Sequence, residues 1–443
     1  PYPIRNELDV PNMFSCQGLF LEFMMFIQCS SGDEVFTAVK FSLCLLSFIT
    51  HIAYIIFIEV AMVDLLRGLS KQNVIKNNIQ LDRELVLSMA GKHATLSLLY
   101  DVIQEQLLWK VQSVDIEKEC RQVVLQSYRL LFLTKYVVDI LEQQGIKAVV
   151  LKGVATASFY AVPELRKSGD IDLLIPDNVN ISRLTEIMVQ QGFKVAEEQH
   201  ANHHIVFKTP EGISIELHIM LAEPFACKRI NRTMEKQVKM CWNHVEQKNI
   251  MGVVLPILDK PFHAYELLLH MLQHFMYAGF GLKLLCDWVM IRRQDWSAEE
   301  QQIFKGLIAE SGLEEFTKAV TAVCIKYLGL ETVPGIEKFT VEEETTAELL
   351  REILDAEDFG SSDVNRMVMM NGTGPTAYIR EFHHQMHLNF PQIGRCFLLW
   401  PILWIITLGR FLQNNRKVRK TSAGKILKEA NRRSKLMEEL KIF

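Results

Sequence analysis

Two aspartates stand in one short apolar stretch, "DIDLLI", at residues 170–175. A β-strand places residues i and i+2 on the same face, so Asp170 and Asp172 point the same way while the residues between them point into a core. Neighbouring carboxylates repel each other unless a positive group lies between them. Oxygen ligands of this kind suit a divalent cation, above all Mg²⁺. The stretch therefore predicts a strand that carries part of a metal site.

A second alternating stretch, "ISIELHI" at 213–219, supplies a third carboxylate. Its apolar residues share one face, and Glu216 and His218 share the other. If this strand lies beside the first in one sheet, Glu216 joins Asp170 and Asp172 at one position. Such carboxylates form a hard-oxygen site for Mg²⁺ or Mn²⁺. Ions bound there can clamp a nucleoside triphosphate and stabilise the leaving pyrophosphate.

A turn suited to phosphate precedes both strands, in "VVLKGVATASFY" at 149–160. Gly153 allows a close approach of the backbone, the helix expected after it offers N–H groups, and Lys152 adds a positive charge. Just before the acid pair, Arg166 is expected to contact either the first aspartate or phosphate. Ser168 either caps the turn or contacts phosphate.

Several histidines and one helical pair are candidates for supporting the acids or contacting an acceptor. His218 either orients Glu216, approaches substrate or is a histidine of the core. His270 and His274 are four residues apart, a spacing that can bind metal, but the zinc-protease pattern is missing, which favours a supporting or core role. A lysine and an aspartate four apart on the next helix can pair with each other. The candidates are His204, His218, His274, Lys283 and Asp287.

Hydrophobic periodicity predicts an α+β fold in which a small mixed sheet is embedded between helical regions. The length of 443 residues allows two or three domains. We expect a hydrophobic N-terminal segment at 1–61, a helical region at 62–145, the α/β core at 146–225, a helical domain at 226–358, a loop-rich linker at 359–392, and a Trp-rich amphipathic and basic tail at 393–443.

Two segments are candidates for membrane contact. Residues 41–58 form an apolar run of 18 residues, the lower limit for a spanning helix. Residues 396–408, "CFLLWPILWIITL", carry two Trp and lead into a basic tail, which is typical of an interfacial helix on anionic lipid. Buried packing within a helical domain is the alternative for both. Nine scattered cysteines without a CxxC pair favour a reducing compartment. These features predict a cytoplasmic protein, peripheral to or anchored in an inner membrane.

The charge of the chain is unevenly distributed. Residues 410–443 carry 11 Lys or Arg against three Glu, whereas the whole chain has a net charge of −4. The remaining body is therefore acidic, which argues against nucleic acid as a partner because nucleic-acid binding depends on neutralising phosphates. Because of the basic tail, nucleic acid stays a possible partner, and an anionic membrane surface is a further one.

The order of these motifs resembles the nucleotidyltransferase superfamily of the DNA polymerase beta fold. More closely, residues from about 62 to 443 resemble the bacterial family of uncharacterised nucleotidyltransferases. The superfamily usually has Gly or Ser after the first glycine of the turn, where this chain has Val154, and this substitution puts the phosphate contacts in question. The matching parts are Lys152-Gly153, Arg166, Asp170, Asp172, Glu216, His218, His274, Gly281-Leu282, Asp287 and the run 400–420.

The resemblance implies a palm-like core and a Mg²⁺- or Mn²⁺-dependent enzyme. Asp170, Asp172 and Glu216 would hold metal and carry catalysis, and the Lys152 turn would hold the triphosphate. A nucleoside monophosphate would pass from the triphosphate to a hydroxyl of an unidentified small-molecule or peptide acceptor. Two alternatives remain open: a catalytically silent, membrane-associated nucleotide-binding protein, favoured by Val154, and a tRNA-modifying toxin or phosphotransferase that uses the same acids.

Overall fold

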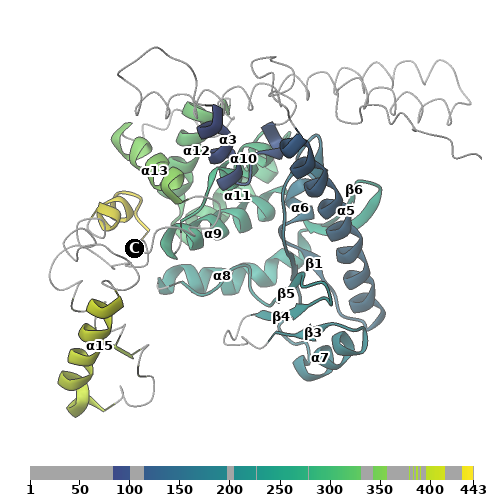
Figure 1. Cartoon of the computed structure of the whole chain (residues 1–443). Coiled ribbons are helices and arrows are strands. Elements are labelled where there is room, and N and C mark those ends of the chain that lie inside the picture. Colours follow the sequence, from purple (N-terminus) through teal and green to yellow (C-terminus); the bar gives the residue numbers. More distant parts are fainter. Residues whose placement is uncertain are drawn as a thin grey trace, which may run out of the picture.

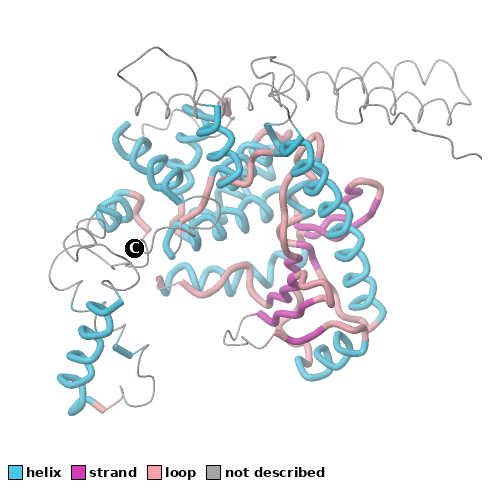
Figure 2. The backbone as a smooth tube through the Cα atoms, viewed as in Figure 1, coloured by secondary structure: helices cyan, strands magenta, loops and turns pink. Residues whose placement is uncertain are grey.

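A seven-stranded mixed sheet lies between helices in the computed structural model of the chain (Figure 1 and Figure 2). The structure describes residues 83–99, 114–196, 204–225, 227–277, 279–330, 343–356, 379, 383, 386–387, 390, 396–414 and 432–442. The candidate membrane segment 41–58 lies outside these residues.

The strands follow the order β3-β4-β5-β2-β1-β7-β6. The pairs β2–β5 and β1–β7 are parallel, and the other neighbours are antiparallel. The strands are β1 Val149–Val150, β2 Ile171–Leu174, β3 Lys194–Val195, β4 His204–Lys208, β5 Ser214–His218, β6 Val245–Ile250 and β7 Val253–Leu258.

Helices precede, interrupt and follow the strands. The N-terminal ones are α3 Arg83–Lys92, α5 Val114–Gln143, α6 Val154–Ala157 and α7 Ile181–Gln190. The later ones are α8 Lys228–Met240, α9 Lys260–Tyr277, α10 Leu282–Arg292, α11 Ala298–Ser311, α12 Glu314–Leu328, α13 Glu343–Ala356 and α15 Trp400–Asn414. The expected α+β class, with a mixed sheet between helical regions, is confirmed.

The sheet separates two hydrophobic cores because its side chains alternate between faces. Ile171, Leu173 and Ile215 pack with α5 and α7 on one side. Leu174 packs on the other side, into the core that α9 and α10 build with the remaining helices. In Figure 1 the long α5 flanks the sheet on the side opposite α9. The polar positions of β2 and β5 therefore face α9 and α10.

Two strands of the sheet come from a segment where helices were expected. β6 and β7 form a hairpin that closes with Met251 and Gly252, both at positive φ, as in a type I′ turn. Asn249 accepts a hydrogen bond from the Gly252 N–H at 2.9 Å. The polar, half-exposed β6 lacks the apolar alternation of a buried strand, so its sequence "VEQKNI" gave little signal. The expected domain boundaries themselves stay a prediction.

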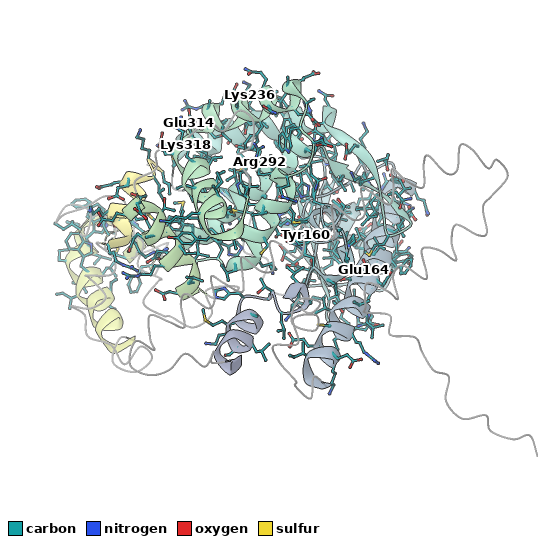
Figure 3. The ribbon with its side chains drawn as sticks, turned by 90° about the horizontal axis from the view of Figure 1, so that it is seen from above. Tyr160, Glu164, Lys236, Arg292, Glu314 and Lys318 are labelled. Carbon is teal, nitrogen blue, oxygen red and sulfur yellow. The ribbon has the colours of Figure 1, made fainter. Side chains whose placement is uncertain are left out.

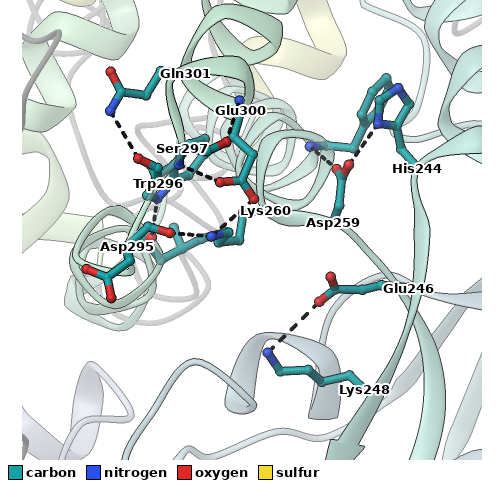
Figure 4. Close-up of polar contacts among 12 residues, drawn as sticks. His244, Glu246, Lys248, Asp259, Lys260, Asp295, Trp296, Ser297, Glu300 and Gln301 are labelled. Atoms are coloured by element: carbon teal, nitrogen blue, oxygen red, sulfur yellow. Dashed lines mark hydrogen bonds and ion pairs between the residues drawn. The ribbon is translucent and has the colours of Figure 1, made fainter. Parts of the chain in front are cut away.

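Asp259 fixes the start of α9 to the end of this hairpin (Figure 4). Its carboxylate accepts from the Phe262 N–H at 3.2 Å and pairs with His244 Nδ1 at 2.7 Å. An Asp at this position satisfies an orphan amide of the first helical turn. Lys260 then pairs with Glu300 of α11 at 3.1 Å. The helix that covers the polar face of the sheet is thus anchored at its first turn.

The end of the basic tail packs against the helical domain. Leu436, Met437 and Leu440 are buried in the same core as α9 and α12. Arg433 pairs with Glu352 of α13 at 3.2 Å and lies 6 % exposed. This part of the tail belongs to the helical domain, because its arginines have internal carboxylate partners.

Helix α15 carries an exposed apolar surface, and it lies on the opposite side of the molecule from α5 (Figure 1). Ile402 and Ile405 are 57 % and 71 % exposed, and Leu398, in the turn before the helix, is 71 % exposed. Within the described residues, no helix combines the length and the apolar character that crossing a bilayer requires.

Candidate active site

Asp172 and Glu216 lie directly opposite each other on the parallel strands β2 and β5. The register sets this pairing, and alternation turns both side chains to the face covered by α9. His218 follows two residues later on the same face of β5. One ligand atom from each of these three residues lies within 4.8 Å of the others. The predicted proximity of the two strands is therefore observed.

Asp172 is the most enclosed of the acids, at 3 % exposure. Its Oδ1 accepts from Lys152 Nζ at 3.0 Å and pairs with His218 Nε2 at 2.9 Å. Burial alone would raise the pKa of Asp172, but the charge of Lys152 and the contact with His218 outweigh it and lower the pKa. Asp172 is thus an anion across the physiological pH range.

The contacts of Asp172 favour the charged forms of both its partners. Burial would lower the pKa of His218, yet its hydrogen bonds to Asp172 and Glu216 raise it above the ordinary value. His218 lies 3.5 Å from Glu216 Oε2. Burial also works against the charged form of Lys152, but Asp172 and Glu266 raise its pKa overall. The charge of Lys152, and that of His218 when it is protonated, therefore offset the charge of the acids.

Asp170 lies just before β2 and is exposed at the rim of the same cavity. Partial burial of its carboxyl group, followed by the nearby charge of Asp172, raises the pKa of Asp170 to about 6. Its ligand atoms are outside the closest cluster, which consists of Asp172, Glu216 and His218. Asp170 and Asp172 thus share a site but differ in protonation: one titrates near neutral pH and the other stays ionised.

Gly153 makes the turn between β1 and α6 with φ +55° and ψ −114°. A Cβ added there would lie 3.4 Å from the backbone oxygen of Asp170, an ordinary van der Waals contact, so the positive φ is what favours glycine. The next residue, Val154, is 5 % exposed and packs into the core shared with α5. Its side chain therefore belongs to the core, while Ser168 lines the cavity and offers a hydroxyl.

Arg166 connects the turn, the loop before β2 and helix α10. Its Nε and Nη2 donate to the two carboxylate oxygens of Asp287, each at 2.7 Å. Its Nη1 donates to the Gly153 carbonyl at 3.2 Å and to Ser168 Oγ at 2.7 Å. Tyr160, labelled in Figure 3, donates to Asp287 Oδ1 at 2.7 Å. Asp287 is fully buried and accepts hydrogen bonds from both Arg166 and Tyr160.

The three acids, His218, Lys152 and Ser168 line one cavity of about 420 Å³. This volume is within the usual range for small-molecule sites. Helix α9 contributes His270 and His274, whose rings meet edge to face at 4.4 Å, and α10 contributes Lys283. Burial, together with the charges of Lys152 and His274, lowers the pKa of His270 well below its usual value. The backbone of His204 pairs in register with His218 at the start of β4. Asp287 supports the cavity from behind its wall.

The donor set fits a divalent cation. Asp172 and Glu216 offer carboxylate oxygens, and Asp170 adds another at the rim. Ligation by His218 requires its neutral form, so a cation there competes with the proton that Asp172 and Glu216 stabilise. Lys152 also competes with a cation for Asp172, because its ammonium already bonds to Asp172 Oδ1. The residues suit Mg²⁺ or Mn²⁺ by their chemistry.

Sequence patterns did not single out Glu266, a residue of α9 close to the site. It is 1 % exposed, and burial raises its pKa to about 8 against the opposing charge of Lys152. A lone acid inside the apolar helical run "AYELLLHML" was the available signal.

The comparison with protein families identifies the chain. A model of the uncharacterised nucleotidyltransferase family matches residues 80–329, more than half of the sequence. The chain belongs to this family, which confirms the predicted family and the enzyme class, a nucleotidyltransferase. The expected bacterial origin stays a prediction. No curated protein matches the chain.

Two solved nucleotidyltransferase structures show distant similarity. The lincosamide antibiotic adenylyltransferase LnuA, bound to lincomycin, has 12 % identity and a TM-score of 0.22, and the alignment covers 40 % of this chain and 94 % of that one. An antigenic nucleotidyltransferase-like protein from Paracoccidioides brasiliensis has 15 % identity and a TM-score of 0.27, with coverage of 47 % and 93 %. Scores of this size carry no argument about the substrate of this chain.

Proposed function

We propose that the protein transfers a nucleoside monophosphate from a nucleoside triphosphate to an acceptor hydroxyl and releases pyrophosphate. The observation that carries this proposal is the convergence of Asp172, Glu216 and His218 beside Lys152 in one cavity. The acceptor oxygen forms a bond to the α-phosphorus, and the bond from that phosphorus to the bridging oxygen breaks. The hydroxyl proton passes to the Glu216 carboxylate.

Asp170, Asp172 and Glu216 would hold Mg²⁺ or Mn²⁺. When bound, the cation supplies positive charge against the phosphate oxygens. His218 orients Glu216 and Asp172 through its contacts at 3.5 Å and 2.9 Å. Partial enclosure of Glu216, whose side chain is 29 % exposed, leaves it accessible to an acceptor.

The triphosphate would lie along the Gly153 turn. Lys152 and Ser168 both line the cavity there and can donate to phosphate oxygens. Arg166 is committed to Asp287 and therefore holds the turn and Ser168 in place. The Ser168 hydroxyl can supply the contact for which Val154 has no group, and this favours an active enzyme over a silent binder.

The acceptor would approach from the wall formed by α9 and α10. That wall offers His270, Gln273, His274 and Lys283, all polar, with Leu284 as an apolar contact. This composition suits a hydroxylated polar acceptor, small enough for the cavity or presented on a peptide.

Label transfer from nucleotides tests the assignment. Purified protein would be incubated with α-labelled ATP, CTP, GTP or UTP, Mg²⁺ and a cell extract as the acceptor pool. We expect labelled product and pyrophosphate from the wild type. Asp172→Asn should lower the rate by at least about a hundredfold, because the variant loses charge at the cation site.

Asp177→Asn is the matched control, since Asp177 is exposed in the loop after β2 and lies outside the cavity. It should keep the wild-type rate. Equal transfer by wild type and Asp172→Asn would reject the assignment. Tight binding of a Mg²⁺-nucleotide without pyrophosphate release from any pool would favour the silent binding protein.

We also propose that α15 rests on an anionic lipid surface. Leu398, Ile402, Ile405 and Ile406 are exposed at spacings of three to four residues and form one apolar stripe. Residues 410–428 add seven Lys or Arg and no acid directly after it. This combination of a stripe and an adjacent basic run is typical of interfacial helices, whose affinity depends on anionic lipid.

Sedimentation of the full chain with vesicles tests this attachment. We expect binding to phosphatidylserine-containing vesicles, weaker binding to pure phosphatidylcholine, and loss in Ile402→Asp/Ile405→Asp. Leu125→Asp/Phe132→Asp on α5 is the control, because those side chains are 70 % and 60 % exposed without a basic run beside them. Unchanged sedimentation of the α15 variant with vesicles would refute the proposal. It would also be refuted if the variant bound vesicles normally and differed from the wild type only in its oligomeric state.

A further inference from the structure

Glu266 is a buried carboxyl group with no hydrogen-bond partner. It lies in the middle of α9 at 1 % exposure, and within the described part of the chain neither of its carboxylate oxygens accepts a hydrogen bond. Buried polar groups without partners are rare, because they lose their contacts with water and gain nothing in return. Such a group needs an explanation beyond packing.

Four charged groups of the candidate site act on Glu266. They are Lys152 at the turn after β1, Asp172 on β2, His218 on β5 and Arg166 in the loop before β2. Burial raises the pKa of Glu266 to about 8, and Lys152 is the main opposing influence. Near neutral pH the carboxyl group is therefore mostly protonated, beside a lysine whose bond goes to Asp172.

Lys152 needs a second partner once a cation binds. At present its ammonium bonds to Asp172 Oδ1 at 3.0 Å. A divalent cation on Asp172 and Glu216 would neutralise that oxygen and repel the ammonium. Glu266 lies on the same face of α9 as His270 and Gln273, which line the cavity together with Lys152. An ammonium has three donors, so one can turn to Glu266 while another faces phosphate.

We propose that Glu266 is a positioning residue that accepts the Lys152 ammonium when a divalent cation occupies Asp172 and Glu216, and that it releases its proton to solvent as it does so. This inference rests on the proposed function. In this step the Glu266 carboxylic acid becomes a carboxylate, the lysine keeps its charge, and Glu266 releases one proton to the buffer. Any proton that the cation displaces from His218 is released in addition, and equally by the wild type and by variants of Glu266.

Proton release during Mn²⁺ binding tests the inference without an acceptor. Calorimetric titration at pH 7.5 in two buffers of different ionisation enthalpy counts the protons. Asp170 contributes little at this pH because its pKa is about 6. We expect Glu266→Gln to release nearly one proton fewer than the wild type and to bind Mn²⁺ about tenfold more weakly.

Lys152→Met is a second variant with the same expected deficit, because Glu266 then has no cation to stabilise its ionised form. Glu235→Gln, on the exposed side of α8, is the matched control and should release as many protons as the wild type. Thermal melting would verify that each variant is folded. Asp172→Asn should abolish the binding and thereby locate the Mn²⁺.

The two proposals fail in different ways. Binding of Mn²⁺ with equal proton release in wild type and Glu266→Gln overturns the role of Glu266 and leaves the proposed function standing. A deficit in Glu266→Gln but full release in Lys152→Met also overturns it, because the lysine would then play no part. Failure of the wild type to bind Mn²⁺ overturns both proposals.

Discussion

At the scale of single residues, the buried ion pair of Arg166 and Asp287 is the strongest constraint on the site. The side chains are 6 % and 0 % exposed, and the contact is bidentate at 2.7 Å. Asp287→Asn would leave the guanidinium charged and uncompensated. We expect the free energy of unfolding to fall by about 3–5 kcal/mol. Tyr160→Phe, which removes a single neutral donor to the same carboxylate, should cost about 1 kcal/mol. Urea unfolding measures both, and equal losses would contradict this ranking.

The raised pKa of Asp170 predicts a pH dependence for cation binding. Below its pKa of about 6 the carboxyl group is protonated and neutral, so it is a poor ligand. Mn²⁺ affinity should therefore rise with pH, by about tenfold between pH 5 and pH 7 from this group alone. Asp170→Asn should show a flatter profile in the same titration. A variant profile as steep as that of the wild type would assign the dependence to another group.

Residue patterns predicted that Asp172 and Glu216 share one face of the sheet, but they did not predict the contacts of the residues around them. The alternation of β2 and β5 placed Asp172 and Glu216 on one face, because the period of a strand is fixed by its backbone. The partner of Arg166, in contrast, comes from α10, 121 residues later. Spacing along the chain carries no information about such a contact. Glu266 was missed for the same reason, since its neighbours belong to other elements.

At the scale of elements, the Gly153 turn should be intolerant of a side chain. Its φ of +55° with ψ of −114° is strained for any other residue. Gly153→Ala should lower stability by about 1–3 kcal/mol and weaken the binding of a Mg²⁺-nucleotide. Gly212→Ala, at φ +89° with free space around it, is the control outside the cavity. It should cost stability without changing nucleotide affinity, as measured by unfolding and by calorimetry.

Elements with strong periodicity were predicted correctly, and weakly patterned ones were not. The expected strands near 171–175 and 213–219 are present as β2 and β5. The hairpin of β6 and β7 was missed, because β6 is polar at the edge of the sheet and takes its stability from its neighbour. The secondary structure of this region depends on strand pairing, which cannot be deduced from the sequence of one segment alone.

At the scale of the whole molecule, the C-terminal residues 432–443 should contribute to stability. Leu436, Met437 and Leu440 are at most 2 % exposed, and each buried side chain of this kind contributes about 1.5–3 kcal/mol. Removal of residues 432–443 would also leave Glu352, 5 % exposed, without its arginine partners. We expect a fall of several kcal/mol in thermal unfolding. Lys435→Met, at an exposed position, should have almost no effect, and a truncated chain as stable as the full one would contradict the packing.

The ion pair of Arg166 and Asp287 limits where the chain can be truncated. A fragment that ends at residue 225 would keep β2 and β5. It would lose Asp287, the strands β6 and β7, and the helices α9 and α10 that cover the acids. Its guanidinium would have no counter-ion, and one flank of β1 would be an open edge prone to pairing with other copies. Catalytic competence is thus a joint property of segments more than a hundred residues apart, and a minimal expressible unit must include both.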